Sequence, residues 1–183
     1  MEYKGVTIYQ TPEETDNIRK LVRETKGVPG VIAEVGVFQG ASAAIIREET
    51  RKELWLFDTF NGFPNSLDES DCRAYYVGDC KAPEEYVQRL MKGKKNVHIV
   101  VGEFPKTADP IKDKKFSFVH IDVDIYNSTK EALEFFSHRM SPGGIILVHD
   151  YPAHPGVKKA VQESGLDFEV LGLGGRQGVW KMT

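Results

Sequence analysis

Apolar positions along the chain occur in short continuous runs that alternate with stripes at helical spacing. Continuous runs indicate buried strands, whereas apolar residues that recur every three or four positions indicate helices. The runs lie at residues 31–37, 54–57, 97–101, 116–121, 144–148, 168–171 and 178–181. The last two are separated only by the glycine-rich segment 172–175, and so short a connection requires an antiparallel pair. The pattern therefore predicts an α/β fold with a doubly wound, mostly parallel seven-stranded sheet and an antiparallel last strand.

Capping patterns predict where two of the helices begin. Thr11 and Glu14 are spaced as in a capping box, in which each residue satisfies a free N–H group of the first turn. Ser128 and Glu131 repeat this spacing ahead of a second apolar stripe. Further helices are predicted at about residues 41–49, 83–91 and 157–163. Residues 61–79 are polar and rich in Gly, Pro, Asp and Ser, which predicts a long loop, and loops of that length are usually functional.

Composition and charge narrow the class of protein. The 183 residues predict one domain, 1–183, large enough to bury a core. The formal net charge of -3 leaves no basic surplus for a phosphate backbone, so we expect no nucleic-acid partner. The apolar runs are too short to cross a membrane, and no signal peptide is visible after Met1. We interpret Cys72 and Cys80 as free thiols of a cytoplasmic protein.

The first candidate site is the segment 34–42, which follows a predicted strand and opens a predicted helix. Gly36 and Gly40 would let a ligand approach the backbone, and the helix offers free N–H groups. Glu34, ahead of the glycines, could bind the amino group of a cationic ligand. The pattern is not the G-x-G-x-x-G of dinucleotide-binding domains. The alternative interpretation is a tight strand-to-helix turn with a surface glutamate.

A second candidate is Asp58, which ends the predicted strand 54–57. It lies about 20 residues after Gly36, the separation at which an acidic residue binds ribose hydroxyls in nucleotide-binding units. The alternative is an aspartate that caps a helix or stabilises a turn.

Acidic residues also follow two later strands. Asp122 and Asp124 come after the run 116–121, and His149 and Asp150 after the run 144–148. Ligands of open α/β sheets bind outside the carboxyl ends of the strands, and neighbouring strands lie only about 4.8 Å apart. If these strands are neighbours, Asp122 and Asp150 could share a divalent cation, which leaves Asp124 free as a base. The alternative is a pair of aspartates that cap the following helices.

Together these segments resemble a known family. The chain is similar to the macrocin O-methyltransferase-like group, which includes sugar O-methyltransferases of antibiotic biosynthesis. The resemblance rests on five segments in the same order, 34–42, 57–64, 101–105, 120–129 and 148–151.

The resemblance implies a Rossmann-like class I methyltransferase fold and a cytoplasmic enzyme that transfers a methyl group from S-adenosylmethionine to a hydroxyl of a small molecule. It implies a divalent metal ion as well, Mg²⁺ or Mn²⁺, and a homo-oligomer is left open. The residues implied in cofactor binding are Glu34, Gly36, Gly40, Ser42, Asp58, Thr59, Gly102 and Asp122. The implied metal ligands are Asp122, His149 and Asp150, and the implied general base is Asp124.

One departure from the family bears on the metal. The family has two aspartates before the tyrosine of the last segment, whereas this chain has His149 at the first of these positions. An imidazole ligand favours Mn²⁺ and softer ions over Mg²⁺. Two other functions stay open at this point, a nucleotide-dependent oxidoreductase and a partner module that binds the cofactor without catalysis.

Overall fold

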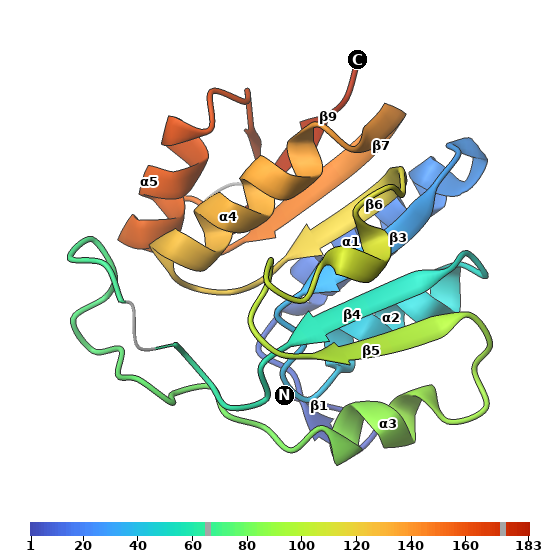
Figure 1. Ribbon diagram of the computed structural model, residues 1–183, viewed down its shortest axis with the longest axis horizontal. Coiled ribbons are helices and arrows are strands. Elements are labelled where there is room, and N and C mark those ends of the chain that lie inside the picture. The colour runs from blue at the N-terminus through green and yellow to red at the C-terminus, as the bar shows by residue number, and fades with distance from the viewer. Residues whose placement is uncertain (65–66, 173–174) are drawn as a thin grey trace.

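A seven-stranded sheet forms the centre of the protein in the computed structural model, which describes residues 1–64, 67–172 and 175–183 (Figure 1). The strand order is β5-β4-β3-β6-β7-β9-β8. The first five strands of the sheet in chain order are parallel, and β9 runs antiparallel to both β7 and β8. The strands are β3 (Val31–Val35), β4 (Leu54–Asp58), β5 (Val97–Val101), β6 (Phe116–Ile121), β7 (Met140–His149), β8 (Glu169–Leu171) and β9 (Gln177–Lys181). The predicted fold class is confirmed, and half of the predicted turn 172–175 lies outside the described residues.

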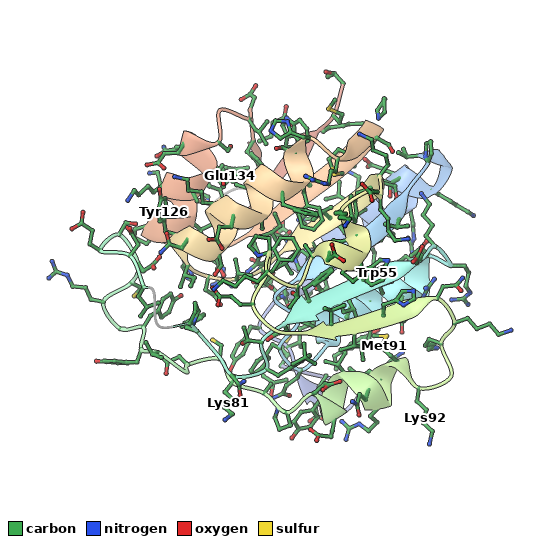
Figure 2. All side chains as sticks on the ribbon, in the orientation of Figure 1. Trp55, Lys81, Met91, Lys92, Tyr126 and Glu134 are labelled. Atoms are coloured by element: carbon green, nitrogen blue, oxygen red, sulfur yellow. The ribbon has the colours of Figure 1, made fainter. Side chains whose placement is uncertain are left out.

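Helices cover both faces of this sheet. Side chains of α1 (Pro12–Glu24), α2 (Ala41–Glu49) and α3 (Glu85–Met91) pack on one face, and those of α4 (Tyr126–Ser137) and α5 (Pro155–Glu163) pack on the other. Short 3₁₀ turns occupy Thr25–Gly27 and Asp109–Ile111. Trp55 of β4 and Met91 of α3 belong to the cores on opposite faces, and side chains fill the space between sheet and helices (Figure 2). The sheet is therefore buried on both sides, as continuous apolar strands require.

The chain order creates a switch point in the sheet. From β3 the chain builds outward through β4 to β5, and then returns to place β6 on the other side of β3. Ligands of open α/β sheets bind where the direction of building reverses, at the carboxyl ends of the strands. The fold therefore predicts a ligand-binding site at the carboxyl ends of β3 and β6.

A hairpin that the sequence patterns did not predict precedes the first helix. Strands β1 (Glu2–Tyr3) and β2 (Val6–Thr7) pair antiparallel, and Lys4 and Gly5 both have positive φ, as the tight turns of hairpins require. Two-residue strands are too short to show a period, which is why the pattern missed them.

The two predicted capping boxes have different outcomes. In α1 the box is confirmed, because Thr11 N donates to Glu14 Oε2 at 2.7 Å and Glu14 N donates to Thr11 Oγ1 at 3.2 Å. The prediction at Ser128 is wrong, because α4 already begins at Tyr126. The first N–H group of α4 is satisfied by a residue far away in the sequence, since Tyr126 N donates to Asp71 Oδ1 at 2.7 Å.

The predicted loop 61–79 is confirmed as part of a longer connection. Between β4 and α3, the described residues contain neither helix nor strand. The connection swings out beside α5 before it returns to α3 (Figure 1). It is attached there by Asp71 at the start of α4 and by Lys159 Nζ, which donates to Asp68 Oδ1 at 3.0 Å. None of the helices in the described residues has the length and apolar character that crossing a membrane would take.

Gly36 is the tightest point at the switch and provides a test of this packing. Its φ is +84°, and a Cβ placed there would lie 1.9 Å from the carbonyl oxygen of Asp122. Gly36→Ala should lower the free energy of unfolding by about 1–3 kcal/mol or more, because the ends of β3 and β6 must separate. Urea denaturation measures the change. Gly27→Ala is the matched control, since a Cβ at Gly27 meets nothing within 4 Å; equal stability of the two variants would contradict the close approach.

Candidate active site

A cavity of about 380 Å³ lies at the carboxyl ends of the central strands. Residues that follow β3, β4, β5, β6 and β7 line it, and the N-terminal segment adds Thr7, Tyr9 and Gln10. The predicted site residues that line the cavity are Gly36, Ser42, Asp58, Thr59, Gly102, Asp122, Asp124, His149 and Asp150. Glu34 and Gly40 were also predicted to bind the cofactor but are not among the lining residues.

The turn between β3 and α2 presents backbone to the cavity. Gly36 and Phe38 both have positive φ, and Gly40 caps α2 in a left-handed conformation. No side chain caps the first turn of α2, and Ala41 and Ser42 in that turn line the cavity. The free N–H groups of this helix start therefore direct a partial positive charge toward the cavity.

Asp58 holds this turn in place. Its Oδ2 accepts hydrogen bonds from Val37 N at 2.7 Å and Phe38 N at 2.8 Å, and its Oδ1 accepts one from Phe60 N at 2.7 Å. The turn role, which the sequence left as the alternative, is therefore present in the structure. Because Oδ1 accepts a single bond, it keeps capacity for a ligand hydroxyl as well.

Glu34 is fully buried beneath the cavity and pairs with His120. The register of β3 against β6 sets the two residues side by side, and their Oε1 and Nδ1 atoms are 2.8 Å apart. Burial raises the pKa of Glu34, and the hydrogen bond and charge of His120 oppose that rise. The sequence did not reveal this pair because it depends on the register of two strands that are far apart in the chain.

His149 lies at the centre of a group of carboxylates. Its Nδ1 lies 2.9 Å from Asp150 Oδ2 and 3.3 Å from Asp122 Oδ1, and its Nε2 lies 3.6 Å from Glu14 Oε2. Burial alone would lower the pKa of His149, but the charge of Asp122 and the other neighbouring carboxylates raise it to about 12. The imidazolium of His149 therefore balances part of the negative charge of the acidic group.

Asp124 occupies a strained position beside the same group. Its φ is 61°, in the left-handed region, and its Oδ1 lies 3.6 Å from His154 Nδ1. Burial and then the charge of Asp122 raise the pKa of Asp124 well above its usual range. The hydroxyl of Tyr75, in the long loop, is hydrogen-bonded to His154 Nδ1 at a distance of 2.8 Å. A carboxyl with a raised pKa in a cavity is a candidate acid or base.

The donor atoms fit a divalent cation. Ligand atoms of Asp122, His149 and Asp150 lie within 4.8 Å of one another, and so do those of Asp124, Asp150 and His154. Asp150 belongs to both groups, and its Oδ1 is buried without a hydrogen-bond partner. Carboxylate and imidazole donors suit Mn²⁺ and neighbouring transition ions, and Mg²⁺ less well.

Sequence reasoning missed several residues of this site. Gln10 and Tyr9 carried no pattern, and Glu14 was explained fully by the capping box. Arg176 lines the cavity, and its guanidinium lies 3.4 Å from both Glu14 Oε1 and Asp150 Oδ1. Its position just after the glycine-rich segment 172–175 was the only signal in the sequence, and it did not distinguish Arg176 from a surface residue.

Solved structures that superpose on this chain include methyltransferases. The O-methyltransferase NovP superposes with a TM-score of 0.77 at 25% sequence identity, over 93% of this chain and 80% of that one. The calicheamicin methyltransferase CalS11 superposes with a TM-score of 0.78 at 20% identity, over 91% of this chain and 77% of that one, a likeness that shows the fold alone. The protein therefore has the Rossmann-like class I methyltransferase fold.

Residues 12–167 match the family described as Macrocin-O-methyltransferase (TylF), and the chain belongs to that family. It is 29% identical over 154 residues to 8-demethyl-8-(2,3-dimethoxy-alpha-L-rhamnosyl)-tetracenomycin-C 4'-O-methyltransferase of Streptomyces olivaceus, across 74% of this chain and 59% of that enzyme. It is 28% identical over 178 residues to demethyldecarbamoylnovobiocin O-methyltransferase of Streptomyces niveus, across 85% of this chain and 66% of that enzyme. The predicted family is confirmed, and the chain spans only part of the length of these relatives.

The bonds of Asp58 predict a local effect of its removal. Asp58→Ala leaves the N–H groups of Val37 and Phe38 without their acceptor, which should destabilise the turn by about 1–3 kcal/mol. Amide hydrogen exchange at Val37 and Phe38 should therefore become faster, while exchange in β6 stays unchanged. Unchanged exchange at Val37 and Phe38 would show that the carboxylate does not hold the turn.

Proposed function

We propose that this protein is an enzyme that transfers the methyl group of S-adenosylmethionine to a hydroxyl of a small molecule, with a divalent cation in the site. A sugar of a glycosylated natural product is the acceptor class that the named relatives suggest. The observation that carries the proposal is the meeting of Asp122, Asp124, His149 and Asp150 beside the glycine turn of one cavity, in a chain of this family.

We assign the cofactor to the glycine-turn side of the cavity. Gly36 and Ser42 would allow close approach of the ligand to the backbone and to the start of α2. Asp58 would accept a ribose hydroxyl on the remaining capacity of Oδ1, and Thr59 and Gly102 lie on the same wall. Glu34 and Gly40 act indirectly in this proposal, because neither lines the cavity.

Asp122, His149 and Asp150 would hold the cation. A cation bound there would lower the pKa of the acceptor hydroxyl. Asp124 would then take the hydroxyl proton on a carboxylate oxygen. The sulfonium methyl group requires only an aligned oxygen nucleophile, so the cavity otherwise contributes proximity and orientation.

The other functions that the sequence left open find less support. An oxidoreductase would need the dinucleotide-binding glycine pattern, which the segment 34–42 does not have. A binding module without catalysis would not need Asp124 in a strained conformation among carboxylates. Both alternatives are decided by the following experiment.

Calorimetric titration and a methyl-transfer assay test the proposal together. S-adenosylmethionine should bind the protein with or without added metal, because the assigned cofactor contacts lie mainly on the glycine-turn wall. With a panel of sugars and glycosides, isotope-labelled methyl groups should reach an acceptor, excess chelator should stop the transfer, and Mn²⁺ should restore it better than Mg²⁺. Failure to bind S-adenosylmethionine would contradict the function, whereas full transfer in excess chelator would contradict only the cation.

Asp124→Asn tests the assignment of the base. The amide keeps the shape of the carboxyl but cannot take a proton, so turnover should fall about 10²–10⁴-fold. Binding of S-adenosylmethionine and Mn²⁺ should persist. Asp113→Asn, at an exposed position away from the cavity, is the control and should keep normal turnover. Near-normal turnover of Asp124→Asn would exclude Asp124 as the base.

A further inference from the structure

The segment 7–14, from the end of β2 to the first turn of α1, lies directly against the group of carboxylates around His149. Gln10 is only 6% exposed, and its Nε2 donates to Asp122 Oδ2 at 2.6 Å. Glu14, four residues later, is equally buried and faces Nε2 of His149. Two of the three residues assigned to the cation therefore each contact a side chain of this segment.

We propose that Gln10 and Glu14 are positioning residues of the cation site, Gln10 for Asp122 and Glu14 for His149. The inference rests on the proposed function, because it concerns the same cation. Partners of this kind fix the orientation of a ligand side chain and raise its affinity for the metal, although they do not touch the metal themselves.

The contact of Gln10 decides which oxygen of Asp122 is available. Oδ2 is taken by the amide of Gln10, and Oδ1 lies 3.3 Å from His149 Nδ1, on the side of the proposed cation. An amide donor fixes the carboxylate without neutralising it, so Asp122 keeps its full charge for a cation. A side chain without an N–H group at position 10 would leave Oδ2 of Asp122 without this donor.

The contact of Glu14 decides which nitrogen of His149 is available. Nε2 is buried without a hydrogen-bond partner, and Glu14 Oε2 at 3.6 Å is the carboxylate that faces it. A proton on Nε2 leaves Nδ1, which faces Asp122 and Asp150, as the nitrogen for a cation. Glu14 is itself held by Thr11 N, 2.7 Å from Oε2, and by Arg176 Nε, 3.4 Å from Oε1.

The segment is also attached at points away from the cation site, and these points supply a matched control. Thr7 N donates to Gln39 Oε1 at 2.7 Å, and the rings of Tyr9 and Phe38 have their centroids 5.6 Å apart. Gln10→Met and Gln39→Met therefore each remove one hydrogen bond of the same segment while they keep side-chain volume. Only the first variant removes a partner of Asp122.

Mn²⁺ binding, followed by electron paramagnetic resonance of the free ion, is the direct measurement. Gln10→Met should weaken Mn²⁺ binding about 10–100-fold, the usual effect of removing such a partner. Glu14→Gln should weaken it in the same direction, because glutamine can still close the capping box but cannot act as a carboxylate toward His149. Gln39→Met should bind Mn²⁺ as the wild type does.

The outcomes separate this inference from the proposed function. Equal losses in Gln10→Met and Gln39→Met would show that attachment of the segment matters and not the contact with Asp122, which overturns the inference. Normal Mn²⁺ binding by Gln10→Met would overturn it too, while the proposed cation site stands. Absence of Mn²⁺ binding in the wild type would overturn both this inference and the proposed cation site. Thermal melting of the metal-free variants identifies any that fail to fold.

Discussion

The site depends on one electrostatic constraint, the meeting of several carboxylates at the adjacent ends of β6 and β7. Parallel pairing of these strands sets Asp122 beside His149 and Asp150, and Asp124 follows within the same turn. Buried carboxylates at such distances repel one another unless a cation or a hydrogen-bond donor lies between them. His149, Arg176 and the amide of Gln10 supply that compensation from three different parts of the chain. Each of these groups is held in place by its contact with a carboxylate.

The sequence predicted the elements that depend on local patterns. The strands of the sheet and the capping box of α1 follow from apolar runs and from spacing, which are properties of neighbouring residues. The start of α4 could not be predicted in this way, because its first N–H group is satisfied by Asp71 from the long loop. The hairpin β1–β2 was not predicted for another reason, since a strand of two residues cannot show a period.

The same distinction applies to the candidate site. Strand ends predicted correctly that Asp58, Asp122 and Asp150 lie at one edge of the sheet. Their bonding partners depend on register and on long-range contacts, so the sequence did not reveal the three N–H groups around Asp58 or the pairing of Glu34 with His120. Residue type and position along a strand thus predict where a group lies more reliably than what it contacts.

The bond from Tyr126 N to Asp71 divides the long loop into two parts with different roles. Phe63 brings the long loop to the cavity wall, so a substitution at this position would change the lining of the cavity. Asp71 instead completes the first turn of α4, and α4 begins two residues after Asp124. The bond therefore separates the part of the loop that shapes the cavity from the part that holds the start of α4.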